Sequence, residues 1–303
     1  MSDVKFKHYT KKFNIIESSP KYYEPLDAWY RDGTSDKVMF QDCIRNYGNI
    51  ETQKDDIVLD LGANIGGAGK VFQNKVEKVI SVEADNFNFQ VLEHNLKDHS
   101  NCINLCGAVV GPGEYGEANF MVNNSANNAC SMKITPSNIK NFKRKDKLFK
   151  VVPTYSITDL YQEYKPTILK MDIEGYEYNI LKENIPDHIH TICLELHGSN
   201  KAMFLKMIKI VELLKINWAI DNFWPVWVFG GLSCIELTGT RKDFKNVDMN
   251  LDYIDDNKSF QEVKGILKEN PTQNNEKALK QIDEALEFYK DWYDPKTKVK
   301  SLL

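Results

Sequence analysis

The sequence predicts an α/β fold in which a mostly parallel sheet carries helices on both faces. Two observations lead to this class. Short aliphatic runs typical of buried strands alternate with segments whose apolar residues recur at helical spacing. The first run, 57–61, passes through a glycine-rich turn directly into a helix, in the segment VLDLGANIGGAGKVF (58–72). Parallel strands need a crossover between them, commonly a helix, so this alternation favours a parallel sheet.

Composition limits the classes of protein that fit. The chain has 303 residues, 42% hydrophobic and 27% charged, enough for one large domain or two small ones. Its net charge of −4 gives no reason to expect nucleic acid as the main partner. No apolar run reaches the ~20 residues of a membrane span, and the polar start does not resemble a signal peptide. We therefore expect a cytoplasmic protein. Six scattered cysteines without a CxxC pair favour reduced thiols over disulfides or a zinc site.

The expected elements follow in chain order. Residues 1–50 form an N-terminal segment of helical and extended character, and 51–240 form the main domain. Strands are predicted over 57–61, 78–85, 102–110, 149–157, 167–175 and 190–198. Helices are predicted from 66, over 86–98, just before Pro166 and over 200–215. Residues 111–150 break the rhythm with Gly, Pro, Asn and short β-like pieces, which predicts a β-rich insertion. An aromatic hairpin should follow over 217–237.

The C-terminal residues 241–303 differ from the rest in being polar. One stretch, NEKALKQIDEALEFYKDWYD, carries apolar residues on one helical face. We expect a helical appendage that packs on the core or on a partner. The sequence does not indicate an oligomeric state.

The turn Gly62–Ala63–Asn64–Ile65–Gly66 lets the backbone approach a ligand closely, because side chains are nearly absent there. A dehydrogenase fingerprint requires G-x-G-x-x-G, and here Asn64 replaces the glycine that would meet a pyrophosphate. Asp60, two residues before the turn, suits a ligand with a cationic amino-acid end. Glu83 ends the second strand, where a carboxylate can accept hydrogen bonds from two ribose hydroxyls. These residues favour S-adenosylmethionine (SAM) over a dinucleotide, with a purely structural turn as the alternative.

The segments VLDLGANIGG, VEADNFNFQVLEHN and LKMDIEGYEYNIL resemble the FkbM-type SAM-dependent methyltransferases. The segment RDGTSDKVMFQDCIRNYG (31–48) also resembles a part of that group, and the match covers about 25–240. The resemblance implies a doubly wound seven-stranded sheet and methyl transfer to hydroxyls, often on sugars or natural-product scaffolds. Gly67 stands where the family often has an aromatic residue. The tail after about 240 has no counterpart in the family.

We assign cofactor contacts to the turn and to the polar or small residues near the strand ends. The predicted cofactor-binding residues are Asp60, Gly62, Ala63, Asn64, Gly66, Glu83, Ala84, Ala108, Asp172 and Ser35. Ser35 enters because Thr34 or Ser35 is expected to cap a helix whose first amides can hold the SAM carboxylate.

The predicted catalytic residues are His197, Asp172 and Glu174, at the ends of the fourth and fifth strands. A sugar hydroxyl is too weak an acid to ionise unaided, so a general base is needed. His197 has the chemistry of a base near neutral pH. Asp172 either holds the SAM amino group or touches the acceptor. Glu174 either takes part or caps the helix that begins near Tyr176.

A divalent metal held by Asp172, Glu195 and His197 is an alternative device, which we do not favour, so no metal ligand is assigned. His188 and His190 lie on the far side from the site. The aromatic residues Phe223, Trp224 and Trp227 either stack on the acceptor or pack the hairpin. The asparagine-rich segment 123–131 either binds polyols or forms turns.

The expected function is SAM-dependent O-methylation of a small-molecule or glycan acceptor. Two alternatives remain open. One is an N-methyltransferase acting on a peptide or small-molecule amine, and the other is a non-catalytic SAM-fold binding module.

Overall fold

The structure, a computed structural model, describes residues 4–10, 12–122, 130–133, 142–144, 147–181, 184–198, 201–228 and 231–242. The chain divides into two compact units, residues 1–196 and 197–303. This division falls inside the range predicted as one main domain. The expected appendage, 241–303, lies almost entirely outside the described residues and stays a prediction.

Five parallel strands form the sheet of the first unit. They are β5 (Ile57–Leu61), β6 (Lys78–Glu83), β7 (Cys102–Cys106), β13 (Ile168–Met171) and β14 (Thr191–His197). β5 pairs with β6 on one side and β13 on the other, while β7 pairs with β6 and β14 with β13. Strand order therefore reverses at β5 and β13, which is where open α/β sheets bind ligands.

The second unit contains α6 (Lys201–Asn217) and the antiparallel pair β15 (Trp218–Val228) and β16 (Gly231–Arg241). The sheet has seven strands in the order β15-β16-β14-β13-β5-β6-β7. The predicted seven-stranded, mostly parallel sheet is confirmed.

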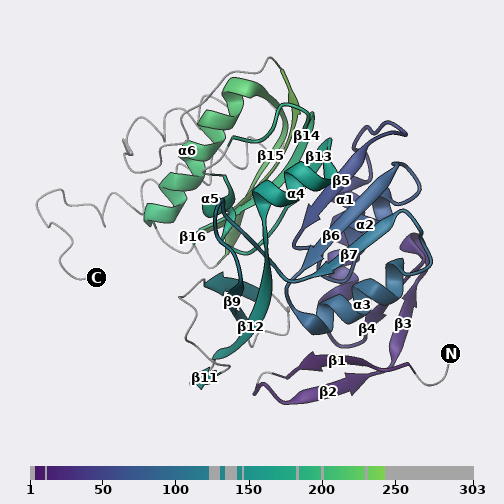
Figure 1. The fold of residues 1–303 in the computed structure, drawn as a ribbon. Helices are drawn as coiled ribbons and strands as arrows, with labels where there is room; N and C mark the ends of the chain where they lie inside the picture. The colour runs from purple at the N-terminus through teal and green to yellow at the C-terminus, as the bar shows by residue number, and fades with distance from the viewer. Residues whose placement is uncertain are drawn as a thin grey trace, which may run out of the picture. The chain divides into compact units, whose positions relative to one another are not determined.

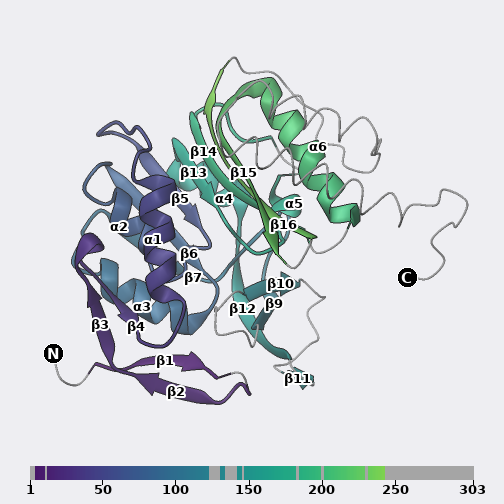
Figure 2. The same cartoon turned by 180° about the vertical axis from the view of Figure 1, so that it is seen from behind.

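The helices of the first unit are α1 (Asp36–Tyr47), α2 (Gly67–Phe72), α3 (Asn86–Leu96), α4 (Ile157–Tyr164) and α5 (Glu177–Ile180). α1 packs on α2, and α2 packs on α3. Figure 2 shows α1 in front of the strands, whereas α4 lies before them in the opposite view of Figure 1. Helices thus cover both faces of the sheet, as a doubly wound fold requires.

Two antiparallel strand pairs precede α1. The first pair is β1 (Phe6–Tyr9) with β2 (Ile15–Ser18), and the second is β3 (Pro20–Tyr23) with β4 (Ala28–Arg31). The short 3₁₀ helix η1 (Glu24–Leu26) connects β3 to β4. A buried ion pair fixes the passage from β4 to α1. Arg31 and Asp36 are each 1% exposed, and Nε and Nη2 lie 2.8 and 2.9 Å from the two carboxylate oxygens. The same Nη2 donates to Asn88 on α3 at 2.8 Å, which ties the start of α1 to that helix.

The predicted β-rich insertion is present. It contains β8 (Ala108–Val110), β9 (Glu117–Val122), β10 (Cys130–Lys133), β11 (Phe142–Arg144) and β12 (Lys147–Ser156). The expected single strand over 102–110 is wrong, because it breaks at Gly107 into β7 and β8. A side chain at Gly107 would meet the Pro153 carbonyl at 2.7 Å. After this glycine the chain leaves β6 and pairs with β12 instead.

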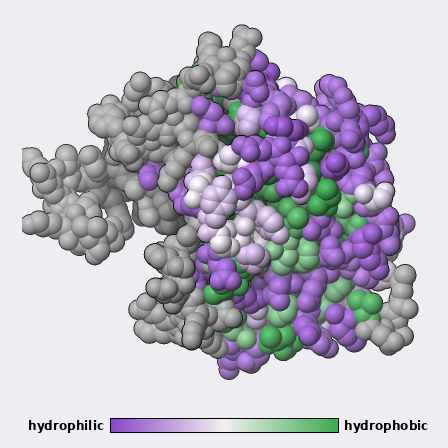
Figure 3. Space-filling view, in the orientation of Figure 1, coloured by the Kyte–Doolittle hydropathy of each residue, from purple (hydrophilic) through white to green (hydrophobic). Residues whose placement is uncertain are grey.

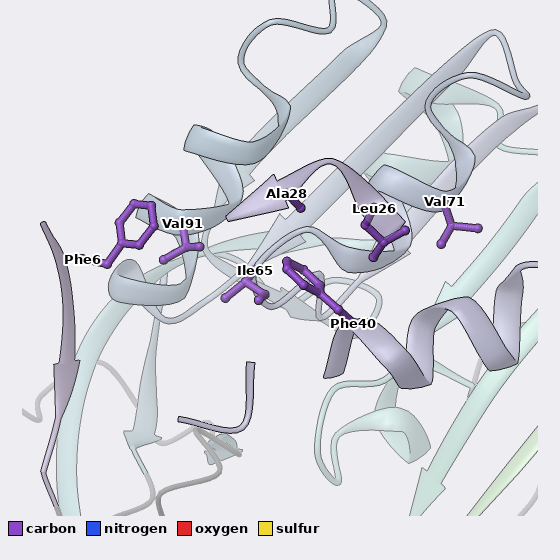
Figure 4. Close-up of a cluster of buried hydrophobic side chains, with 7 residues drawn as sticks. All are labelled: Phe6, Leu26, Ala28, Phe40, Ile65, Val71 and Val91. Carbon is purple, nitrogen blue, oxygen red and sulfur yellow. The ribbon is translucent and has the colours of Figure 1, made fainter. Parts of the chain in front are cut away.

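The hydrophobic cluster in Figure 4 joins the N-terminal elements to the residues that follow β5. Its buried members are Phe6, Leu26, Ala28, Phe40, Ile65, Val71 and Val91. Ile65, the fourth residue of the glycine-rich turn, is 1% exposed and lies beside Phe40 of α1 in Figure 4. The turn is therefore anchored in the core by its one large side chain.

The tight packing of α1 also explains Gly67. A Cβ there would lie 2.7 Å from Cys43 Sγ and 3.2 Å from the Phe40 ring. α1 therefore leaves no room for a larger side chain at position 67.

The face shown in Figure 3 is mostly hydrophilic among its coloured residues, and its apolar residues lie in separate patches. Among the described residues, no helix is both long enough and apolar enough to span a bilayer.

Candidate functional site

The turn after β5 depends on left-handed backbone at three positions. Gly62, Asn64 and Gly66 have φ values of 77°, 51° and 88°. Glycine adopts this region freely, and asparagine is among the few other residues that tolerate it. Asn64 therefore stands where a second glycine would be expected without preventing the turn.

Gly62 brings the turn against the end of β13. A Cβ on Gly62 would lie 1.7 Å from the backbone carbonyl oxygen of Asp172, a distance that no side chain tolerates. The Asp172 N–H donates to Leu61 O at 3.0 Å, and the Gly62 N–H donates to Val82 O at 3.0 Å. The ends of β5, β6 and β13 thus meet at the turn, as the sequence predicts.

Glu83 fixes the other side of the turn. One carboxylate oxygen accepts the Asn64 N–H at 2.8 Å, and the other accepts the Asp85 N–H at 2.7 Å. Burial raises the pKa of Glu83 to about 7, with a further contribution from the Asp85 carboxylate. Each oxygen can still accept a second hydrogen bond, so the predicted contact with two ribose hydroxyls fits this geometry.

The three alanines among the predicted cofactor-binding residues differ in how exposed they are. Ala63 and Ala108 are each 3% exposed, whereas Ala84 is partly buried. Ala108 packs in the core of the insertion with Ala118 and Phe120. Its contact with a cofactor stays a prediction.

Ser35 occupies the N-cap position of α1, as expected, but its side chain makes no capping hydrogen bond. Thr34 supplies a hydrogen bond at the start of α1 instead, because its Oγ1 accepts the Asp36 N–H at 3.2 Å. Ser35 Oγ and Asn64 Oδ1 are buried without a hydrogen-bond partner in the part of the chain that the structure describes. Buried polar atoms are costly unless paired, so both suit contact with a polar ligand.

The segment after β13 also turns through left-handed backbone, with φ 57° at Glu174 and 104° at Gly175. The N-cap of α5 is Tyr176, whose side chain makes no capping hydrogen bond, and the role of Glu174 stays a prediction. The Glu177 carboxylate accepts the Ile173 and Gly175 N–H groups at 3.3 and 3.0 Å. Glu174 is a non-glycine residue in a region that costs about 1 kcal/mol or more, which is a feature that functional sites often show.

Asp60 has a partner that the sequence reasoning missed. Its carboxylate is 0% exposed and lies 3.0 Å from Lys170 Nζ on the neighbouring strand. Both Asp60 carboxylate oxygens are buried without a hydrogen-bond partner among the described residues, so a direct contact with a cofactor amino group stays a prediction. The signal in the sequence was a lysine inside the apolar run TILKM.

His197 is the last residue of β14 and the first of the second unit. Its catalytic role, and the alternative metal site that includes it, stay predictions. In the second unit Phe223 is buried at 8% exposure, which favours packing over acceptor contact. The side chains of Trp224 and Trp227, and residues 123–129, lie outside the described part of the chain.

His190, one of the two histidines that the sequence analysis excludes from the site, lies at the opposite end of the sheet. His190 precedes β14, and its Nε2 lies 2.7 Å from Asp56, which precedes β5. Thr167, just before β13, donates to the same carboxylate at 2.7 Å. The prediction that His190 is remote from the strand ends is confirmed.

The family model for the FkbM methyltransferase domain matches residues 60–216, just over half of the chain. The matched span begins at Asp60 and includes the turn, Glu83 and Asp172. The chain belongs to the FkbM methyltransferase family. The predicted resemblance to this family is therefore confirmed.

Three solved structures resemble the chain at low identity. The FkbM methyltransferase from Methylobacillus flagellatus KT is 19% identical with a TM-score of 0.39, over 63% of this chain and 45% of its own. TrmK from M. capricolum, in complex with S-adenosyl-homocysteine (SAH), is 8% identical with a TM-score of 0.39, over 83% of this chain and 96% of its own. Trm5b from Pyrococcus abyssi is 11% identical with a TM-score of 0.43, over 79% and 63%. The chain thus spans less than half the length of the FkbM relative. No curated protein matches the chain.

The turn fits the cofactor of this family. Gly62 and Asn64 are partly exposed, Glu83 offers carboxylate acceptors, and the buried Asn64 Oδ1 offers a further acceptor. When bound there, SAM supplies an electrophilic methyl group.

Replacing Gly62 tests the contact between the turn and β13. We expect Gly62→Ala to destabilise the protein by about 2 kcal/mol or more beyond the strain of left-handed alanine, because its Cβ overlaps a backbone carbonyl. Gly113→Ala is the matched control, since φ is 72° and a Cβ there meets nothing within 4 Å. Urea unfolding measures both variants, and equal losses would contradict the packing argument.

The pKa of Glu83 predicts proton release on cofactor binding. In the free protein the carboxyl is largely protonated below about pH 7. Hydrogen bonds from ribose hydroxyls favour the charged form, so binding at pH 6 should release a proton and should strengthen as the pH rises through 7. Calorimetry in buffers of different ionisation enthalpy measures the release. Glu83→Gln is the control, and release that persists in that variant would assign the proton to another group.

Proposed function

We propose that the protein transfers the methyl group of SAM to a hydroxyl of a small-molecule or glycan acceptor. The observation that carries the proposal is the contact between Gly62 of the cofactor turn and the Asp172 backbone. It sets the acidic segment Asp172–Ile173–Glu174 directly beside the turn. A group there is close enough to the bound cofactor to act on an acceptor.

The carboxylates favour an alcohol over an amine. A neutral amine attacks an electrophilic methyl group without first losing a proton, whereas an alcohol needs a base to take its proton as the new bond forms. Asp172 and Glu174 supply carboxylates in the first unit. Glu174 is held in left-handed backbone, which fixes the direction in which its side chain leaves the turn.

His197 is our preferred general base, from its chemistry. An imidazole with an ordinary pKa of about 6.5 is mostly neutral at physiological pH and accepts a proton readily. Asp172 then either orients the acceptor or holds the cofactor's amino group. We propose no metal in this reaction, and chelation tests that choice.

Two other functions give different results. An N-methyltransferase would label amines, and a binding module would bind SAM without turnover. The intact turn and its contact with the strand-end acids support an enzyme. Trp224, beside Pro225 in β15, is our candidate for stacking on the acceptor ring.

The test of O-methylation uses SAM with a ¹³C-labelled methyl group. The protein is incubated with separate pools of polysaccharide, glycolipid, small molecules and proteins, and the products are examined by NMR. We expect label as an O-methyl resonance in a glycan or small-molecule pool. Label found as N-methyl groups, or SAM binding without label transfer, would contradict the proposal.

The test of the base compares two variants on the labelled pool. His197→Ala should lower turnover by about 10²–10⁴-fold with SAM affinity unchanged, and wild-type turnover should fall as the pH drops through about 6.5 because imidazolium accepts no proton. Asp172→Asn should lower SAM affinity as well as turnover if Asp172 holds the cofactor. Near wild-type turnover by His197→Ala would assign the base to Asp172 or Glu174. Activity lost with a chelator and restored by Mg²⁺ would establish a metal.

A further inference from the structure

The buried pair Asp60–Lys170 lies directly under the cofactor turn. The two residues are register partners on the adjacent parallel strands β5 and β13. Their side chains are 0% and 5% exposed, and Lys170 Nζ lies 3.0 Å from Asp60 Oδ1. A pair of charges this deep costs desolvation on both sides, so it is weak support for stability alone.

The ammonium also makes contacts with the backbone of the turn itself. Lys170 Nζ donates to Gly62 O at 2.7 Å and lies 3.4 Å from Leu61 O. These are the carbonyls at which β5 ends and the turn begins. A buried carbonyl needs a donor, and at Gly62 the lysine supplies one that a regular strand neighbour does not.

The charge of Lys170 bears on the ligand as well as on the turn. Burial by itself lowers the pKa of a lysine, but the carboxylates of Asp60 and Asp172 raise the pKa of Lys170 above its ordinary value, so the group stays cationic. SAM carries a positive sulfonium, whereas its product SAH is a neutral thioether. An ammonium without a compensating carboxylate would repel SAM, which is cationic at sulfur, but would not repel SAH in this way.

We propose that Lys170 is a positioning residue that holds the Gly62 carbonyl, and that Asp60 neutralises it so that the site accepts a cationic cofactor. Asp60 thus acts on the cofactor at least in part through the charge of Lys170. The inference rests on SAM binding and is independent of the acceptor.

The test measures the affinities of SAM and SAH separately, by calorimetry on the whole chain. In Asp60→Asn the Lys170 ammonium keeps only the Asp172 carboxylate as a compensating charge, so SAM binding should weaken more than SAH binding, by up to about tenfold. In Lys170→Met the remaining carboxylate should move the ratio in favour of SAM, while both ligands bind more weakly because Gly62 O loses its donor.

The double variant Asp60→Asn/Lys170→Met should restore the wild-type ratio and keep the common loss. Asp27→Asn is a control for the loss of one aspartate charge near a buried lysine: Asp27 is 75% exposed and lies 3.5 Å from Lys70 Nζ, and the ratio should not move. Thermal unfolding identifies variants that fail to fold. If only one of the two single variants folds, its ratio of SAM to SAH affinity is enough to test the proposal. Equal loss of SAM and SAH affinity in a folded single variant would overturn the proposal. Failure to find a hydroxyl acceptor would leave these affinities unchanged, so the two proposals fail separately.

Discussion

The absence of a side chain at Gly62 is the constraint on which the site depends. Because the Asp172 carbonyl occupies the space of a Cβ, β5 and β13 come together at the point where both strands end. The turn then reaches Glu83 through the Asn64 N–H, and Lys170 reaches the turn from below. The ends of three strands are thereby joined through contacts to the backbone of the turn, and these contacts fix the positions of the acidic residues that follow the strands.

The two ends of this sheet use similar residues for different purposes. At the N-terminal end, Asp56, Thr167 and His190 form a closed network in which each polar group finds a protein partner. At the C-terminal end, Asn64 and Ser35 keep buried polar atoms with no partner among the described residues. Folding alone accounts for the first arrangement, whereas the second gains from a ligand.

Local patterns predicted most of the fold and the cofactor turn. The run 57–61, the glycines after it and the acid at Glu83 depend on neighbours in sequence, and all of them are visible there. Three features depend on distant partners and were missed. Lys170 finds its anion on another strand, β8 pairs with β12 after the close approach of Gly107 to Pro153, and two amides after β13 donate to Glu177. Each requires knowing which segments pack together, and periodicity does not give that information.

The burial of Ile65 has a consequence for how separable the shared family domain is. The family match begins at Asp60, yet Phe6, Leu26, Ala28 and Phe40, which surround Ile65 together with two residues of α2 and α3, all come earlier in the chain. A fragment trimmed to the matched span would leave the centre of its cofactor turn facing water. Substitutions at these early positions should therefore alter the geometry of the turn, because the N-terminal segment and the family domain share one hydrophobic cluster.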